Sequence, residues 1–163
     1  MLSTQSESIQ LENAIRAFFQ SIKRPQYWSY ITTAAGVHLD RPSAVILQTL
    51  MLQQPKKLGV QDLALLLGIE PPSVTRKTQQ LESAGYLRRW RNPSDRRAVS
   101  LEVTKEGREV AQQLWKAQRN SMNQVLKSWS SSDRQNFVQL FERFANELNA
   151  ATDTNEHTIK KGL

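Results

Sequence analysis

The hydrophobic pattern at the start of the chain predicts two helices. Between residues 9 and 22 the apolar positions recur at steps of four, three and four, which is the spacing of one helix face. These positions are Leu11, Ile15, Phe18 and Ile22. Pro25 interrupts the pattern, and an aromatic segment from Tyr27 onward predicts a second helix that ends near Gly36.

The next segments predict a buried helix followed by a helix-turn-helix. Residues 42–52 are apolar nearly all round, which is typical of a central helix, and Asp40 stands at its expected N-cap. Two shorter helices are expected over residues 59–67, which Gly68 closes, and over residues 71–84. Two short helices joined by a tight turn form a helix-turn-helix.

The second helix of this motif has two unlike faces. Pro71 suits its first turn, because the N–H that proline lacks would be unpaired there. One face carries Val74, Thr78 and Leu81, which we expect to be buried. The opposite face carries Ser73, Arg76, Gln79 and Gln80, with Lys77 beside them. These side chains include no carboxylate and are types that contact base edges or phosphates. Arg76 could be a solvated helix residue, but its central position on this face favours nucleic-acid contact.

After Gly85 the period changes from helical to alternating. Residues 87–91 and 99–103 are predicted strands, and residues 92–97 between them have the composition of a turn. The result is a β-hairpin with a basic tip. Because a hairpin that follows a helix-turn-helix is a wing, we predict a winged helix-turn-helix from about Lys56 to Thr104.

The last third of the chain is predicted to be helical again. Residues 105–128 form one long amphipathic pattern, and Ser132-Asp133-Arg134-Gln135 resembles a capping box that opens another helix. That helix carries a wide apolar stripe made of Phe137, Leu140, Phe141, Phe144 and Leu148. One small lobe cannot cover this stripe and that of the first helix, so we predict self-association through Leu11, Ile15 and these five residues.

The expected fold class is therefore mainly α with a small β-hairpin wing. It combines a winged helix-turn-helix lobe over residues 41–104 with a helical dimerisation lobe. The N-terminal helices in residues 1–40 and the C-terminal helices in residues 105–151 make up the dimerisation lobe. Residues 152–163 are polar and are expected to form a disordered tail.

The charge of the chain points to a polyanionic partner. The formal net charge is +7. Residues 71–108 hold nine basic and four acidic residues, and five arginines lie between Arg88 and Arg97 against one acid. Such clustering is costly without a partner, which would be nucleic acid or an anionic membrane surface. The start of the chain resembles no signal peptide, and no apolar run approaches the roughly 18 residues of a membrane span, so we expect a cytoplasmic protein.

Composition also excludes several kinds of chemistry. With no cysteine, the chain has no disulfide, thiolate metal site, cysteine nucleophile or thiol redox sensor. His38 and His157 are far apart, and the six glycines are scattered singly, so we expect no metal site and no nucleotide cofactor. An enzyme would need a Ser–Lys or paired-carboxylate site, which no spacing marks.

The wing segment resembles that of a known family. Residues 95–104, which read Asp-Arg-Arg-Ala-Val-Ser-Leu-Glu-Val-Thr, are followed by Lys105-Glu106-Gly107. This run is similar to the wing signature of the MarR family of bacterial transcriptional regulators. Ser73-Val74-Thr75-Arg76 upstream resembles the start of that family's recognition helix. The likeness covers roughly residues 10–150. It implies a homodimeric repressor or activator that binds a palindromic operator in double-stranded DNA, and we expect a repressor.

The resemblance also implies roles for single residues. Asp95 would hold an arginine of the wing by a salt bridge, Arg97 would enter the minor groove and Arg96 would contact phosphates. With the helix residues, the expected DNA contacts are Ser73, Thr75, Arg76, Lys77, Gln79, Gln80, Arg89, Arg91, Asp95, Arg96 and Arg97.

Family members are released from DNA by small anionic or phenolic ligands, so an aromatic acid or phenol is the expected effector here. The pocket candidates are Arg16, Tyr27, Trp28, His38, Ala44 and Gln48. Aromatic residues at helical spacing more often belong to a core or dimer interface than to a ligand site. Ala44 also departs from the family, whose members often carry an aromatic residue at this position.

The residues leave two function classes open. The leading one is a ligand-responsive, sequence-specific DNA-binding dimer. The other is a winged-helix module that binds an acidic surface of another protein and shows no preference for duplex DNA. Specific retention of one DNA duplex in the presence of an acidic competitor would separate the two classes.

Overall fold

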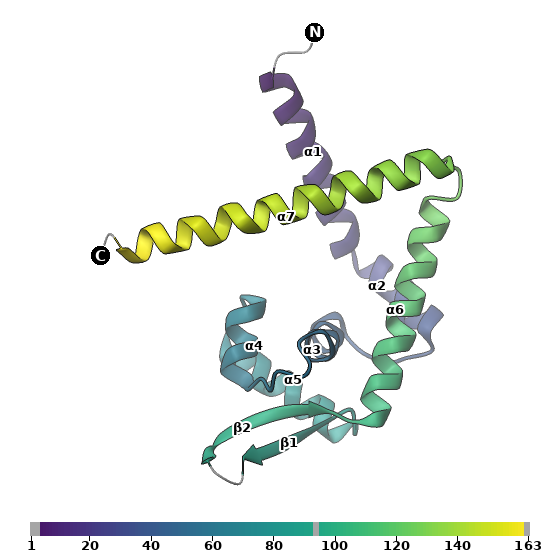
Figure 1. The fold of residues 1–163 in the computed structure, drawn as a ribbon. Coiled ribbons are helices and arrows are strands. Elements are labelled where there is room, and N and C mark those ends of the chain that lie inside the picture. Colours follow the sequence, from purple (N-terminus) through teal and green to yellow (C-terminus); the bar gives the residue numbers. More distant parts are fainter. Residues whose placement is uncertain (1–3, 93–94, 162–163) are drawn as a thin grey trace. The chain divides into compact units, whose positions relative to one another are not determined.

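In the computed structural model nine elements follow one another along the described chain (Figure 1). The backbone is described over residues 4–92 and 95–161, and side chains over residues 5–90 and 99–151. The order is α1 (Thr4–Lys23), α2 (Pro25–Ala35), α3 (Arg41–Leu52), α4 (Val60–Leu67), α5 (Pro71–Ser83), β1 (Leu87–Asn92), β2 (Asp95–Val103), α6 (Lys105–Val125) and α7 (Ser131–Lys161). The prediction of a mainly α fold with one β-hairpin is confirmed.

The chain divides into two compact units, Met1–Ser121 and Met122–Leu163. The first contains α1 to α5, the hairpin and most of α6, and the second contains the end of α6 and α7. That the N-terminal and C-terminal helices form one dimerisation lobe stays a prediction. Within the single chain, the boundary falls inside α6.

The helix boundaries follow the predicted signals in the first half of the chain. Gly36 and Gly68 end α2 and α4 in the left-handed conformation, where glycine meets no Cβ strain. Asp40 caps α3, since the Ser43 backbone N–H donates to Asp40 Oδ1 at 2.9 Å. The predicted burial of α3 holds except at its two ends, where Pro42 and Leu52 are exposed.

The core of the first unit forms around α3, α5 and the base of the hairpin. α5 packs against α3, α4 and β1, and β2 packs against α3 (Figure 1). Side chains from five elements fill this core and are fully or almost fully buried: Ile46, Leu47, Leu63, Val74, Leu81, Leu101 and Leu114. The core holds the two helices of the motif and the hairpin in one arrangement.

The hairpin is longer than predicted and its turn is shorter. β1 and β2 are antiparallel, with Leu87 opposite Val103 and Asn92 opposite Asp95. The strand β2 already begins at Asp95, whereas the sequence places a turn over residues 92–97. The register shifts between Arg91 and Asn92, since Arg91 lies opposite Val99 and Asn92 opposite Asp95, which is the pattern of a β-bulge on β2. The Leu101 N–H also donates to the Leu58 carbonyl oxygen at 2.8 Å, which ties the hairpin to the loop before α4.

The C-terminal helices differ from the prediction at their ends. α6 ends at Val125 rather than near residue 128, because the chain tightens there into a turn in which Trp129 N–H donates to Leu126 O. The N-cap of α7 is Ser130, not Ser132, since the Asp133 N–H donates to Ser130 Oγ at 3.1 Å. α7 also continues through residues 152–161, where the sequence pattern predicts a disordered tail; no glycine or proline interrupts residues 131–161.

Candidate nucleic-acid interface

One face of α5 is buried in the core, and this leaves the opposite face exposed to solvent. Val74 and Thr78 are fully buried and Leu81 nearly so, which confirms the predicted stripe. Ser73, Arg76, Gln79 and Gln80 are all exposed. Because helix positions three and four apart share a face, burying the first set turns the second set to solvent.

The polar side chains of α5 divide into engaged and unengaged groups. Thr75 Oγ1 donates to the Pro71 carbonyl oxygen at 3.0 Å, and Lys77 Nζ binds Asp40 Oδ2 and Gln80 Oε1. Ser73, Arg76 and Gln79 have no side-chain partner among the described residues. These three side chains are therefore available to a ligand without breaking an existing contact.

Asp40 joins the α5 surface to the start of α3. Its carboxylate caps α3 and pairs with Lys77, whose side chain is only 15% exposed. Burial raises the pKa of Asp40, but hydrogen bonds from Lys77 and from the Ser43 N–H lower it, and the net pKa lies below its ordinary value. Lys77, a predicted DNA contact, thus serves here as a structural ion-pair partner.

We expect Asp40→Ala to destabilise the fold by about 1 kcal/mol at neutral pH, because it removes the N-cap of α3. Asp40→Asn keeps the cap and removes only the charge, so it should lower the free energy of unfolding by less than Asp40→Ala does. Because the pKa of Asp40 is lower in the folded state, its ionised carboxylate stabilises the fold at pH values above its unfolded-state pKa of about 4. This stabilisation is lost as the pH falls through the folded-state pKa. Urea unfolding from pH 7 to pH 2 measures the difference between wild type and Asp40→Asn. A difference that stays constant over this range would contradict the linkage.

The arginines at the base of the hairpin are engaged by carboxylates. Arg89 Nε donates to Glu82 Oε2 at 2.9 Å, and Arg88 Nη2 lies 2.9 Å from Glu102 Oε2. Arg89, a predicted DNA contact, is thereby tied to the end of α5. The side chains of the predicted contacts Arg91, Asp95, Arg96 and Arg97 lie outside the described residues.

Lys57 is a residue that the sequence pattern did not single out. Its Nζ lies 3.1 Å from Glu102 Oε1 and 3.2 Å from the centroid of the Trp90 ring. The hydrogen bond from Lys57 is the largest cause of the lowered pKa of Glu102. Burial, the second largest cause, raises this pKa, and the hydrogen bond from Arg88 lowers it again. Lys57 therefore fastens the outer face of the hairpin to the loop before α4, a contact that no local pattern indicates.

We expect Lys57→Met to destabilise the fold by about 1 kcal/mol, because it removes one ion pair and one cation–π contact but keeps the apolar stem. Lys56→Met is the matched control: Lys56 is exposed and forms no ion pair among the described residues, so its change should stay within about 0.5 kcal/mol. Urea unfolding of both variants, with a double-mutant cycle against Trp90→Phe, measures the coupling. Equal losses of stability in Lys57→Met and Lys56→Met would contradict a stabilising role for the contacts of Lys57.

The six predicted effector residues differ in burial and in hydrogen-bond partners. Arg16 is exposed and pairs with Glu12, and His38 is exposed. Trp28 Nε1 donates to the Leu39 carbonyl oxygen at 3.0 Å, and Tyr27 packs against the core. Ala44 is fully buried within the core of the first unit, and Gln48 Nε2 donates to Gln118 Oε1 at 3.1 Å. A cavity of about 660 Å³ lies elsewhere, at the base of the hairpin, and none of the six lines it.

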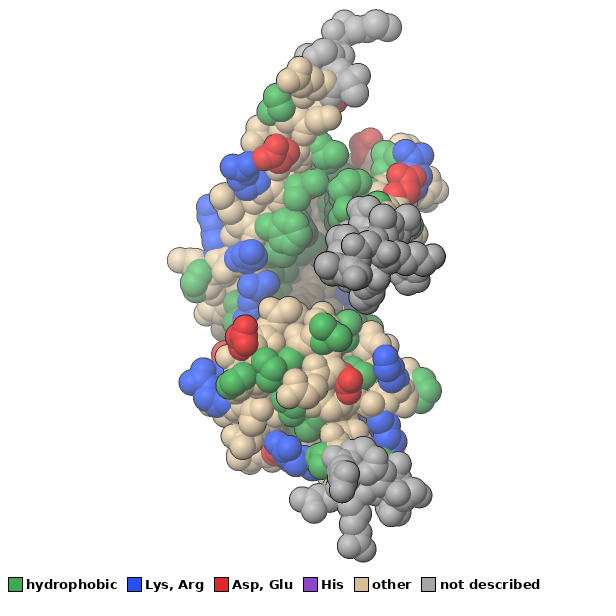
Figure 2. All heavy atoms as spheres, turned by 90° about the vertical axis from the view of Figure 1, so that its left-hand side faces the viewer, with side chains coloured by type: hydrophobic (Ala, Val, Ile, Leu, Met, Phe, Trp, Pro, Cys, Tyr) green, Lys and Arg blue, Asp and Glu red, His purple; other side chains and the backbone are tan. Residues whose placement is uncertain are grey.

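Five of the seven predicted dimer residues are exposed in the single chain. Leu140 and Leu148 of α7 are more than half exposed, and Leu11 of α1 is 50% exposed. The rings of Phe137 and Phe141 stack with centroids 5.6 Å apart on α7. Ile15 and Phe144 are half-buried. Figure 2 shows hydrophobic side chains, in green, open to solvent among the charged ones.

Two further properties concern the described part of the chain. No described helix is both long enough and apolar enough to cross a bilayer. Among the same residues, no group of three or more histidine, aspartate or glutamate side chains is placed to hold a metal ion.

Comparison with known proteins agrees with this geometry. The MarR family model matches residues 39–99, from the start of α3 to β2. The chain is 29% identical over 99 residues to the HTH-type transcriptional regulator YdgJ of Bacillus subtilis, which covers 61% of this chain and 60% of that protein. It is 25% identical over 100 residues to the transcriptional repressor MprA of Escherichia coli, which covers 61% of this chain and 57% of that protein. The match thus spans less than two thirds of either relative.

Solved structures extend the likeness of the fold. A MarR family protein from Bacillus stearothermophilus superposes with a TM-score of 0.78 at 19% identity, over 90% of this chain and 98% of that one. A mutant of Staphylococcus aureus MepR, solved bound to an oligodeoxyribonucleotide, superposes with a TM-score of 0.59 at 15% identity, over 85% and 97% of the two chains. The winged helix-turn-helix of this chain thus matches the MarR family model over residues 39–99, and its fold is similar to that of MarR family proteins.

Proposed function

We propose that this chain is a transcriptional regulator that binds double-stranded DNA through α5. The observation that carries the proposal is the exposed, unengaged set Ser73, Arg76 and Gln79 on one face of that helix. An arginine and an amide can each form two hydrogen bonds to a base edge in the major groove. The one carboxylate of α5, on Glu82, is bound to Arg89 and does not repel phosphate from this face.

The hairpin supplies the second part of the proposed interface. A major groove about 12 Å wide admits one helix, and the wing beside that helix then reaches the neighbouring backbone and minor groove. Arg96 and Arg97 near its tip are the proposed phosphate and minor-groove contacts. Relatives named as transcriptional regulators, and a similar fold solved with an oligodeoxyribonucleotide, support this interpretation.

The test is a selection of bound duplexes from a random-sequence pool. The selected duplex and a scrambled duplex of equal composition are then compared in gel shifts with excess polyglutamate present. We expect the selected duplex to remain bound at least a thousandfold more tightly than the scrambled one. Equal loss of both duplexes to polyglutamate would instead favour the winged-helix module that binds an acidic protein surface.

We further propose that the active form is a homodimer on a palindromic operator. The exposed apolar residues of α1 and α7 supply the surface, and half-sites would lie about 10 bp apart so that both copies of α5 face the same side of the duplex.

Leu140→Glu should convert the dimer into a monomer at micromolar concentration, because a carboxylate would be buried without a partner. Gln139→Glu adds the same charge at the neighbouring polar position and should leave the dimer intact. Sedimentation velocity of wild type and both variants measures this, and a monomeric wild type would overturn the dimer.

Repression relieved by an aromatic acid or phenol completes the proposal. By linkage, a ligand that weakens DNA binding must itself bind more weakly to the DNA complex, by the same factor. A thermal-shift screen of aromatic acids and phenols, followed by calorimetry with and without the selected duplex, measures both quantities. A bound ligand with identical affinities for the free and the DNA-bound protein would exclude this form of regulation.

A further inference from the structure

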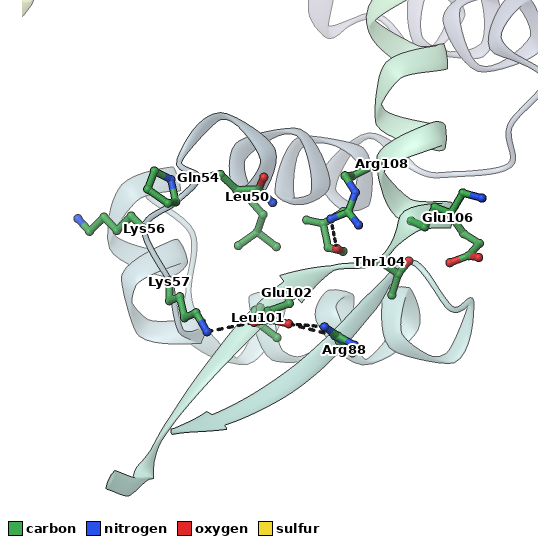
Figure 3. A pocket seen from close by; sticks show the side chains of 13 residues that line it. Leu50, Gln54, Lys56, Lys57, Arg88, Leu101, Glu102, Thr104, Glu106 and Arg108 are labelled. Atoms are coloured by element: carbon green, nitrogen blue, oxygen red, sulfur yellow. Dashed lines mark hydrogen bonds and ion pairs between the residues drawn. The ribbon is translucent and has the colours of Figure 1, made fainter. Parts of the chain in front are cut away.

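A cavity of about 660 Å³ lies at the base of the hairpin, apart from the exposed face of α5 (Figure 3). Its walls come from the end of α3, the loop before α4, both strands and the first turn of α6, and all of them belong to the first unit. The volume falls within the range of about 300–1,000 Å³ that is typical of small-molecule sites. None of the predicted effector residues or dimer residues contributes to it.

The floor of the cavity is aliphatic. Leu50 of α3 and Leu101 and Val103 of β2 line it, and each is only 4% exposed. No aromatic ring is among the lining residues. Such a floor offers dispersion contact and apolar burial to an alkyl chain, but no stacking surface for a flat ring.

The charged lining is mainly cationic, and part of that charge is already neutralised. Two of its members, Lys57 and Arg88, converge on Glu102 from opposite sides (Figure 3). Lys56, Lys105 and Arg108 form no ion pair among the described residues. The one other carboxylate, on Glu106, lies across the start of α6 from the Arg108 guanidinium.

Arg108 is held in place by a hydrogen bond to the backbone. Its Nη1 donates to the Val103 carbonyl oxygen at 2.8 Å, which holds the guanidinium at the end of β2 (Figure 3). A guanidinium has five N–H donors, so this bond leaves others for a carboxylate. A cation held next to an aliphatic floor matches the two ends of a carboxylate that carries an alkyl chain.

We propose that this cavity binds a small aliphatic carboxylate, with the carboxylate on Arg108 and the alkyl chain over Leu50, Leu101 and Val103. The site differs in place and in ligand class from the aromatic effector expected from the family resemblance. It also does not rest on the proposed DNA binding, because its test needs no DNA.

The first experiment is calorimetric titration of the full chain with hexanoate, acetate and hexanamide. Acetate has the charge without the chain, and hexanamide has the chain without the charge. We expect hexanoate to bind with a Kd on the order of 1 mM, and each of the other two to bind at least tenfold more weakly. The proposal would be overturned if acetate or hexanamide bound with the same affinity as hexanoate. It would also be overturned if hexanoate showed no binding at about 20 mM, which is 20-fold the expected Kd.

The second experiment tests whether Arg108 binds the carboxylate. Arg108→Gln removes the charge and keeps a hydrogen-bond donor, and it should weaken hexanoate at least tenfold. Arg119→Gln makes the same change farther along α6, at an exposed residue outside the cavity, and should leave the affinity unchanged. Thermal unfolding of both variants checks that each is folded.

A measurement on the unaltered protein keeps the proposal testable if Arg108→Gln does not fold. Hexanoate should shift the amide resonances of Val103 and Thr104, which line the cavity, and leave those of Ser73 and Gln79 on α5 unmoved. Shifts centred on α5 or on Trp28, with the cavity amides unmoved, would place the ligand elsewhere and reject the site.

Discussion

Gly107→Ala should destabilise the fold by about 3 kcal/mol, the upper part of the usual range for overpacking a core. A Cβ at this position would lie 2.1 Å from the Tyr86 carbonyl oxygen and 2.9 Å from Val103 Cγ1. The Tyr86 carbonyl cannot move aside freely, because it accepts the Thr104 N–H at 3.1 Å. The clash is with backbone at the junction of α5, the hairpin and α6.

The sign of this effect separates packing from helix propensity. Gly107 lies in the first turn of α6, where alanine is intrinsically favoured over glycine by about 1 kcal/mol in a helix. If propensity decided, the variant would be more stable. Gly59→Ala is a graded control, since its Cβ would lie 3.1 Å from the Val99 carbonyl oxygen and needs only a small shift.

Urea unfolding followed by circular dichroism measures both glycine variants. We expect a large loss of stability for Gly107→Ala and a loss below about 1 kcal/mol for Gly59→Ala. The neighbouring Glu106→Ala, at an exposed position, shows what alanine alone does to this turn. A stabilised Gly107→Ala would mean that α6 can shift away from Tyr86 without cost.

Local signals in the sequence predicted the part of the fold that presents α5. The buried stripe of Val74, Thr78 and Leu81 follows from helical spacing, and the left-handed stop at Gly68 follows from glycine chemistry. Asp40 as the N-cap of α3 was equally visible, because capping depends on residues three apart. Each of these features is decided within one turn of the chain.

Features that depend on distant residues were not predictable in this way. The ion pairs of Lys77 with Asp40 and of Arg89 with Glu82 remove two predicted DNA contacts from the unengaged set, and the first of them joins residues 37 apart. The cavity at the hairpin base needs five segments to meet. The first residue of α7 was also not predictable from local signals. Ser130 and Ser132 are both good N-caps, and tertiary context decides between them.

The unengaged set on α5 leads to the second large expected effect. Arg76→Ala should cost about 1–3 kcal/mol per half-site on the selected duplex and much less on a scrambled one. The guanidinium of Arg76 is exposed and has no partner within the described residues, so removing it breaks no contact in the free protein. The loss would then report on DNA alone.

Arg96→Ala is the comparison that shows whether Arg76 contacts bases or only the DNA backbone. A phosphate contact carries no sequence information, so this variant should weaken all duplexes alike and reduce the salt slope by about 1. Arg119→Ala removes an equal charge from α6, outside the proposed interface, and should alter neither quantity. Fluorescence anisotropy with the selected and scrambled duplexes at several salt concentrations measures all three variants. If Arg76→Ala weakens both duplexes equally, α5 holds the backbone and does not read bases, and the specificity must come from the hairpin or from the shape of the DNA.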